Sequence, residues 1–368
     1  MKTSILSAAV LAALASAPIT ASADVKIYGS VQAEYSVEDL NGQSSEQGVD
    51  DNGLRTHIGF KATEKLGNGM TAIALLEFQA NPTGDANGLT DRQQFVGIKH
   101  EKWGFLALGT FKSPYRTAGG SKIDPFYETS LQAVNAGGMS GSTAANGSTI
   151  GHSGFVSSAI YYKSPSFMNT TIDFLISPDE KNNGAKDGNG ATATQRSGDD
   201  NDYAVSVNYK TGPVWAFASY ASNSIDDASN GGDGTNEDAW KLGAQISMGD
   251  HTISGQYEWI DNSDTSGTAA GINSNANGVS NFSITDGSDA EVWFLGYQFK
   301  MGNNVFVAQF GESASDNSGI DSEYMAVGMI HHFSKKTRLF AGYSETDTNS
   351  ASNTGDRELW TVGLRKDF

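Results

Sequence analysis

Most of the chain alternates between apolar and polar residues with a period of two, in stretches of about ten residues. In the first such stretch, residues 25–36, Val25 and Ile27 fall on one face, and Lys26 and Gln32 fall on the other. Because successive side chains of a strand point to opposite sides, this alternation predicts a strand between an apolar and a polar medium. The same alternation recurs at 202–210, 240–248 and 252–259.

This reading predicts sixteen strands, joined by connections of alternating length. The tight connections follow the even-numbered strands and the long ones follow the odd-numbered strands, which is typical of an up-and-down transmembrane barrel. No helical stripe of comparable length interrupts the series. The predicted strands are 25–37, 54–64, 70–80, 91–101, 104–111, 155–163, 169–177, 201–210, 213–222, 238–248, 251–260, 290–300, 304–313, 322–333, 336–345 and 357–368.

The length of the strands favours a membrane protein over a soluble β-sandwich. Strands of about ten residues suit a tilted crossing of a bilayer, whereas strands of globular proteins average about five or six residues. Aromatic residues also lie near the predicted strand ends, where they can form girdles at both interfaces. A secreted, soluble, β-rich binding protein remains the alternative. The aromatic residues are Tyr35, Trp103, Phe167, Tyr209, Trp215, Tyr220, Trp240, Trp259, Phe333, Tyr343 and Trp360.

Composition narrows the classes further. Hydrophobic residues make up 38% of the chain, which excludes a helical membrane protein, and the absence of cysteine excludes disulfides and thiolate sites. The formal charge of −18 opposes nucleic-acid binding. Residues 1–23 read as a signal peptide, with Lys2 before an apolar core and Ala21-Ser22-Ala23 as the cleavage site. Residues 24–368 then form one barrel domain.

Several short motifs, in this order along the chain, resemble those of the Gram-negative porin family. They are Val25–Gly29, Gly59–Lys61 with Leu66–Met70, Arg92–Lys99, Leu108-Gly109 with Ser113-Pro114, Asp124–Phe126, Ser334–Tyr343 and Gly363–Phe368. The resemblance covers the whole predicted domain. It implies a homotrimer of sixteen-stranded antiparallel barrels in the outer membrane, with short periplasmic turns and long extracellular loops. It also implies that the third loop, residues 112–154, folds inward, and that Phe368, with Trp360 on the same outward face, is read by the assembly machinery.

Three positions depart from the family pattern. His57 and Thr110 stand where the family usually has arginine, although Arg55 shares the face of His57, and Gln32 stands where an acidic residue is usual. The two arginines missing at His57 and Thr110, together with the acidic long loops, predict a mild preference for cations. The acidic loops are 38–53, 223–238 and 261–289.

The third loop supplies the candidate constriction. Asp124 and Glu128 are expected to present carboxylates to the lumen, opposite a basic wall drawn from Arg55, His57, Lys61, Arg92 and Lys241. Two alternatives stay open: Asp124 forms a turn before Pro125, and Arg92 pairs with the loop to hold it in place. Arg116 and Lys122 are expected to pin the loop. Alternation puts Phe95 and Lys99 on one face, so the inward face of 91–101 is left open.

The expected function is passive diffusion of ions and small hydrophilic solutes through a water-filled channel. A substrate-specific channel is the nearer alternative, and Phe294 and Phe340 are its candidate aromatic lining. No catalysis is expected, because Gly151–Gly154 lacks the G-x-S-x-G pattern. No metal or other cofactor is expected, because adjacent His331 and His332 point to opposite faces of a strand. The remaining expected partner is outer-membrane lipid, including lipopolysaccharide.

Overall fold

The computed structural model describes most of the predicted domain, with gaps in the long connections. The predicted signal peptide, residues 1–23, lies outside the described residues, as do residues 228–231 of the acidic loop 223–238 and residues 263–288 of the acidic loop 261–289. No helix in the described ranges is long and apolar enough to cross a membrane. The described residues are 24–40, 45–51, 55–83, 89–134, 136–141, 152, 155–178, 201–227, 232–262, 289–315, 321–348 and 356–368.

The described residues form one antiparallel sheet with two short helical segments. The helical segments are α2 (Pro114–Thr117) and η1 (Gly120–Lys122). The strands are β1 (Asp24–Leu40), β2 (Glu46–Asp50), β3 (His57–Gly67), β4 (Met70–Gln79), β5 (Thr90–His100), β6 (Gly104–Phe111), β7 (Val156–Lys163), β8 (Thr170–Ser177), β9 (Asp202–Thr211), β10 (Val214–Asp227), β11 (Gly232–Met248), β12 (His251–Asn262), β13 (Ala290–Met301), β14 (Asn304–Ser315), β15 (Ser322–Ser334), β16 (Thr337–Thr348) and β17 (Arg357–Asp367).

The sheet closes on itself at β1. One edge of β1 pairs with β17, from Ser30 opposite Asp367 to Leu40 opposite Arg357. The other edge pairs with β3 along its first half and with β2 along its second half. Since β2 and β3 occupy consecutive halves of one wall position, seventeen strands make a barrel of sixteen positions. The predicted sixteen-stranded antiparallel barrel is therefore confirmed.

The second wall position differs from the sequence prediction in one respect. Residues 46–50, expected within a long loop, form β2, and the predicted strand 54–64 begins only at His57. Without β2, the second half of β1 would have one row of unpaired backbone groups, which β2 satisfies. The hairpin of β10 and β11 is also longer than predicted, because its pairing continues from Ser222 to Asp227 beyond the apolar alternation.

The two faces of the barrel have opposite character. Val25 and Ile27 on β1 are 61% and 58% exposed, whereas Gln32 and Glu34 are buried inside. Trp360, Leu364 and Phe368 also share the exposed outer face at the end of the chain. An apolar exterior around a polar interior suits a barrel whose outer surface contacts lipid.

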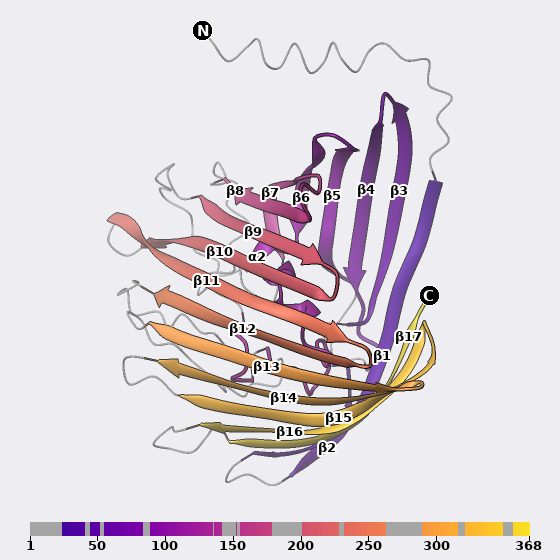
Figure 1. The fold of residues 1–368 in the computed structure, drawn as a ribbon, viewed down its shortest axis with the longest axis vertical. Coiled ribbons are helices and arrows are strands. Elements are labelled where there is room, and N and C mark those ends of the chain that lie inside the picture. The colour runs from indigo at the N-terminus through magenta and orange to yellow at the C-terminus, as the bar shows by residue number, and fades with distance from the viewer. Residues whose placement is uncertain are drawn as a thin grey trace.

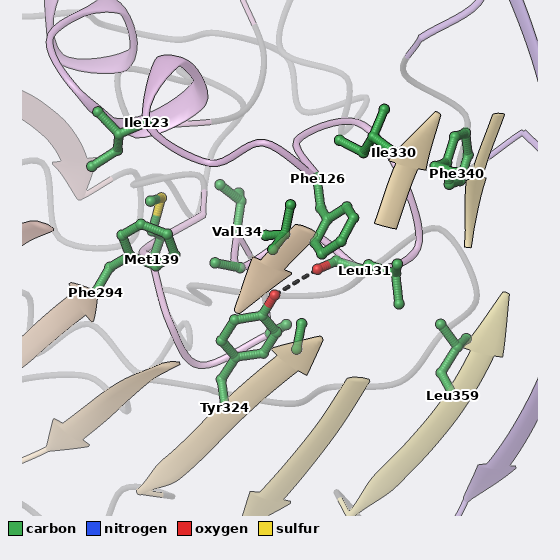
Figure 2. Packing of buried hydrophobic residues seen from close by; sticks show 14 of the residues in the cluster. Ile123, Phe126, Leu131, Val134, Met139, Phe294, Tyr324, Ile330, Phe340 and Leu359 are labelled. Atoms are coloured by element: carbon green, nitrogen blue, oxygen red, sulfur yellow. Dashed lines mark hydrogen bonds between the residues drawn. The ribbon is translucent and has the colours of Figure 1, made fainter. Parts of the chain in front are cut away.

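The third loop, between β6 and β7, folds into the barrel. In Figure 1, α2 lies inside the ring of strands, and it contacts β8, β9 and β10. Apolar loop residues pack against the inner wall (Figure 2), including Phe126 and Leu131 beside Tyr324 and Ile330. Phe294 and Phe340, the candidates for an aromatic lining, belong to this buried cluster. Their rings therefore support the loop and do not face water.

Glycines in the wall let the loop lie close to it. A Cβ atom on Gly328 would lie 2.9 Å from the Phe126 ring, and one on Gly342 would lie 2.7 Å from Leu131. Wall side chains also satisfy the polar backbone of the loop, as when Tyr324 Oη donates to Leu131 O at 2.5 Å. The loop is thus held by packing and by hydrogen bonds, both of which its inward position requires.

Candidate functional site

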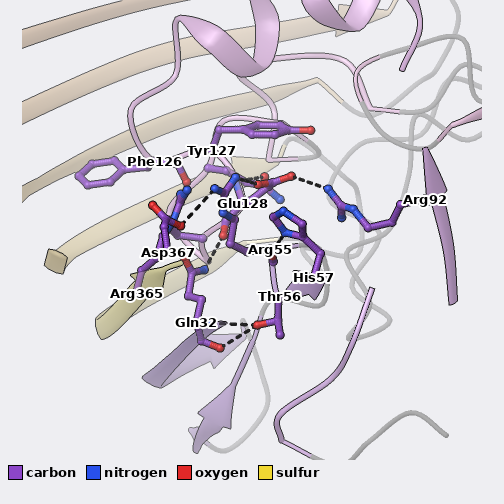
Figure 3. A network of polar contacts seen from close by, with 12 residues as sticks. Gln32, Arg55, Thr56, His57, Arg92, Phe126, Tyr127, Glu128, Arg365 and Asp367 are labelled. Carbon is purple, nitrogen blue, oxygen red and sulfur yellow. Dashed lines mark hydrogen bonds and ion pairs between the residues drawn. The ribbon is translucent and has the colours of Figure 1, made fainter. Parts of the chain in front are cut away.

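Among the described residues, Glu128 of the third loop lies at the centre of a group of charged side chains (Figure 3). Its Oε2 accepts a hydrogen bond from Arg55 Nη1 at 2.6 Å. Its Oε1 lies 3.6 Å from Arg92 Nη2 and 3.8 Å from Arg116 Nη2. These four residues are named the Glu128 cluster. Three guanidinium groups, from β5, from α2 and from the residues before β3, thus share one carboxylate.

Glu128 stays ionised despite its burial. Burial of the carboxylate raises its pKa, but the nearby charges of Arg55, Lys112, Arg92 and Arg116 outweigh it and lower the pKa to about 2. The side chain is only 1% exposed. The carboxylate predicted to face the lumen is therefore covered by its own cations, and its negative charge is cancelled within the cluster.

The backbone of Glu128 is fixed as tightly as its side chain. Its φ of 62° lies in the left-handed region, which non-glycine residues seldom adopt. Gln32 Nε2 donates to its carbonyl at 2.6 Å, and its own N–H donates to Gln132 Oε1 at 3.0 Å. An acidic residue at position 32 could not make this donation. The departure noted at Gln32 thus serves to hold the loop.

Asp124 is also buried, in a separate arrangement. Its Oδ1 accepts from the N–H of Phe126 at 2.8 Å and from Gln309 Nε2 at 2.6 Å. Its Oδ2 accepts from the N–H of Ala133 at 2.9 Å. Burial raises its pKa to about 6, although these hydrogen bonds oppose the rise. The geometry matches the turn that was left open for Asp124, and it ties the loop to β14 at Gln309.

Arg92 contacts the third loop at Glu128 and the neighbouring strand β4 at Glu77. Its Nε donates to Glu77 Oε1 at 2.7 Å, and the side chain is 1% exposed. A register shift between β4 and β5 near Leu76 and Phe78 lets Arg92 and Phe95 both face inward. The Phe95 ring stacks on Phe111 at 4.9 Å. Lys99 alternates onto the same inward face as Phe95.

Lys241 lies in a buried network that the sequence did not reveal. Its Nζ donates to Tyr115 O at 2.5 Å and to His152 Nε2 at 2.9 Å. Ser140 Oγ lies 2.9 Å from His152 Nδ1 and donates to Glu258 Oε2 at 2.5 Å. We name these five residues the return-limb network, because Ser140 and His152 lie where the loop returns toward β7. Lys241, expected in the basic lining, is therefore covered by the loop.

The protonation of this network follows from its donors. Burial lowers the pKa of His152 to about 3, so its ring is neutral near neutral pH. Since the Lys241 ammonium can only donate, Nε2 of His152 accepts, and Nδ1 carries the proton that Ser140 Oγ receives. The Ser140 hydroxyl donates in turn to Glu258. Serine, histidine and glutamate meet here, but the serine hydroxyl is buried and donates to the carboxylate, so the geometry fastens the loop and prepares no nucleophile.

In and beside the Glu128 cluster, two described arginines keep part of their side chains exposed. Arg55 keeps 21% of its side chain exposed, and Arg365 keeps 12%. Arg365 lies opposite Arg338 across β16 and β17, so two guanidinium groups lie side by side. Asp367, 33% exposed, lies 2.8 Å from Arg365 Nε and 3.6 Å from Arg55 Nη2. Two carboxylates therefore accompany these three arginines, Asp367 and Glu128, and Glu128 is shared with Arg92 and Arg116 as well.

The remaining predicted site residues lie nearby but outside the Glu128 cluster. His57 Nδ1 donates to Arg55 O at 2.6 Å, and its Nε2 is 3.9 Å from Glu77. Lys61 of β3 lies opposite Lys26 of β1 in the strand register, whereas Arg55 lies before the start of β3. At the closure of the barrel, the N–H of Phe368 donates to Gly29 O at 3.0 Å. Within the described ranges, no three His, Asp or Glu side chains gather as a metal site.

Comparison with known proteins agrees with this architecture. A family model of Gram-negative porins matches residues 7–351. The major outer membrane protein P.IB of Neisseria gonorrhoeae is 38% identical over 112 residues, which cover 29% of this chain and 32% of that protein. The P.IB protein of Neisseria meningitidis serogroup B is 40% identical over 112 residues, or 29% of this chain and 34% of that protein. Both alignments thus span less than half of the relative's length.

Solved structures show the same fold over almost the whole chain. An anion-selective porin from Comamonas acidovorans gives a TM-score of 0.72 at 20% identity, covering 94% of this chain and 100% of that one. Salmonella typhi OmpF, in complex with daunomycin, gives 0.66 at 14% identity, covering 94% and 97%. At these identities the likeness concerns the fold. The chain therefore belongs to the Gram-negative porin family and forms a β-barrel of the outer membrane.

Proposed function

We propose that this chain forms a water-filled channel for the passive diffusion of ions and small hydrophilic solutes, and that the channel prefers anions. A barrel of sixteen strand positions is too wide for side chains to fill, so an aqueous passage remains. The third loop narrows this passage from within. The charges beside that narrowing then set which ions pass more easily.

One observation carries the preference for anions: the acidic residues of the loop are cancelled or covered, while the wall stays basic. Glu128 is shared by three arginines, and Asp124 is 4% exposed within its turn. Arg55, Arg338 and Arg365 face inward with Asp367 as their exposed acidic neighbour. This proposal reverses the mild cation preference expected from the acidic loops. It rests on the charges of this chain and not on the selectivity of the Comamonas porin.

Reconstitution in a planar bilayer tests whether the chain conducts by diffusion. The conductance of single channels should rise in proportion to KCl concentration, as expected for ions that cross water without tight binding. Absence of conductance steps in correctly folded protein would contradict the channel.

Two paired substitutions test the sign of the selectivity. The double variant R338Q/R365Q removes two inward positive charges. Its reversal potential in a KCl gradient should therefore move away from the equilibrium potential of chloride. K336Q is the matched control, because Lys336 is an exposed lysine of the β15–β16 turn. An unchanged reversal potential in R338Q/R365Q would show that these arginines do not set the selectivity.

The proposal includes the assembly state. We infer a homotrimer, supported by the fold shared with OmpT of Vibrio cholerae, solved in a trimer form, at a TM-score of 0.60 and 12% identity. Conductance steps that occur in groups of three, together with a trimer band that dissociates on heating, would support it. Lipopolysaccharide around the long-loop rim and recognition of Phe368 and Trp360 by the assembly machinery complete the proposed set of partners.

A further inference from the structure

Three lysines lie near one another on the opposite side of the barrel from Arg55, Arg338 and Arg365. Lys163 ends β7, Lys210 lies at the end of β9, and Lys122 is the last residue of η1 in the third loop. Lys163 and Lys210 lie beside the tight turns, which places them on the short-turn side of the loop. Lys122, which is expected from the sequence to pin the loop, has an exposed side chain. We name these three residues the lysine cluster.

The indole of Trp215 lies under two members of the lysine cluster. Lys210 Nζ is 4.5 Å from the centre of the ring, and Lys122 Nζ is 5.9 Å from it. Such cation–π contacts hold an ammonium group in place without cancelling its charge. Trp215 is itself fixed, because its Nε1 donates to Asn208 Oδ1 at 3.1 Å and the residue is 7% exposed.

One carboxylate among the described residues contacts the lysine cluster, and it is already shared. Asp173 Oδ1 accepts from Lys163 Nζ at 2.6 Å and from Tyr161 Oη at 2.5 Å. Its side chain is 3% exposed, so it is turned away from water. The cluster therefore carries an excess of two positive charges.

The excess positive charge affects the pKa of Lys122, the lysine on the third loop. Although Lys122 is exposed, partial loss of water around its ammonium group lowers its pKa. The charges of Lys163 and Lys210 lower the pKa further, while Asp173 opposes them. Repulsion among ammonium groups held by separate elements is relieved when an anion binds between them. An anion with two negative charges and several oxygens can meet two ammonium groups at once, whereas chloride is a single charge.

We propose that Lys122 and Lys210, which lie over Trp215, form together with Lys163 a binding site for small divalent oxyanions on the short-turn side of the third loop. The site rests on the proposed anion-preferring channel, and it adds a class of solute to it. Inorganic sulfate serves as the probe, because its charge does not change over the working pH range. Bound sulfate occupies the passage and so reduces the chloride current.

The test is inhibition of the chloride current by sulfate, added to one side of a planar bilayer at constant ionic strength. Sulfate should inhibit wild type more strongly from the short-turn side. The half-inhibiting concentration should rise about threefold in K122Q or K210Q, as expected for one partly exposed ion pair. K122R should retain inhibition, because it keeps the charge. K336Q, on an exposed turn away from Trp215, should match wild type.

The outcomes separate the site from the channel. Equal inhibition of wild type, K122Q and K210Q by sulfate, with chloride preference intact in all three, would overturn the site and leave the proposed function standing. Absence of a chloride preference in wild type would overturn the proposed function first. Folding of each variant is checked by its heat-dissociable band, so that a loss of inhibition is not confused with a loss of protein.

Discussion

At the scale of single residues, the charge of the site depends on which carboxylates are exposed to water. Glu128 has a low pKa because cations surround it, and Asp124 has a raised pKa because burial dominates. Two carboxylates four positions apart on one loop therefore differ in their surroundings, and neither faces the passage openly. The sign of the charge at the narrowing then comes from the wall and not from the loop.

Replacement of Glu128 by glutamine should loosen the loop and strengthen the anion preference. The change leaves Arg55, Arg92 and Arg116 without their shared carboxylate, and breaking a buried ion pair costs about 3–5 kcal/mol. Current noise should increase, and the reversal potential should move further toward chloride. E101Q, at an exposed turn position, removes the same charge away from the loop and should behave as wild type. Identical recordings from both variants would contradict the role of Glu128.

The raised pKa of Asp124 predicts how the stability of the protein depends on pH. Its folded pKa, about 6, lies above the ordinary 3.8, so its contribution to stability is full below 3.8 and is lost as the pH rises through about 6. The variant D124N does not titrate. The thermal midpoint of D124N minus that of wild type should therefore increase from pH 4 to pH 7. A difference that is constant or decreases over this range would show that the Asp124 pKa is not raised.

At the scale of elements, the third loop is fastened to the wall at three places: the Glu128 cluster, the Asp124 turn on β14 and the return-limb network on β11 and β12. Each fastening joins a polar side chain to a buried partner from a distant part of the chain. The apolar cluster of Phe126, Leu131 and Tyr324 fills the space between them. The loop is thus part of the interior, with its backbone satisfied by the wall.

The return-limb network can be tested with a double-mutant cycle. K241M removes the ammonium and leaves Glu258 buried with one positive neighbour fewer, so the thermal midpoint in detergent should fall, at a cost of about 3–5 kcal/mol. The double variant K241M/E258Q removes both charges and should recover part of that loss. If the loss of stability in K241M/E258Q equals the sum of the losses in K241M and in E258Q, the two charges do not interact.

The sequence predicted the elements well, because alternation with a period of two is a local property. It located the inward faces of β1 and β3, but it placed Glu128 across the passage from Arg55 and Arg92 and gave pairing of Arg92 with the loop only as an alternative. It could not predict that β2 fills half of a wall position, since that depends on which edge of β1 is left unpaired. Nor could it predict the return-limb network, because Lys241 and His152 meet only after the loop has folded back. Burial of Asp124 and Glu128 likewise depends on tertiary contacts.

At the scale of the whole molecule, closure of the barrel joins the two ends of the described chain. The N–H of Phe368 donates to Gly29 O, and a Cβ on Gly29 would lie 2.5 Å from the Phe368 ring. The terminal residue therefore has a structural contact in addition to its expected role in assembly. Edges of a sheet must be paired for a strand to lie in lipid, so this contact lies at a sensitive place.

Deletion of Phe368 should lower the amount of folded protein in the membrane fraction, because both the closing contact and the expected assembly signal are lost. F368Y keeps an aromatic ring and should restore assembly, whereas F368A should not. The amount of heat-dissociable protein in membranes measures the effect. Normal assembly of the deletion variant would contradict both roles of Phe368.

The long connections are acidic in sequence, whereas Arg55, Arg338 and Arg365 make the described wall beside the third loop basic. Charges on the rim are screened beyond a Debye length of about 8–10 Å near physiological salt, so their influence should decline as salt increases. The arginines lie close to any ion that passes, so their influence should persist. The two contributions are therefore distinguished by ionic strength.

The most direct test is the reversal potential of the wild-type channel in a KCl gradient, measured in dilute and in concentrated salt. We predict a potential that shows chloride crossing more easily than potassium, and a preference that is clearest in concentrated salt, where the acidic rim is screened. A potential that shows potassium crossing more easily under both conditions would contradict the account, because the loops and not the arginine wall would then determine the selectivity.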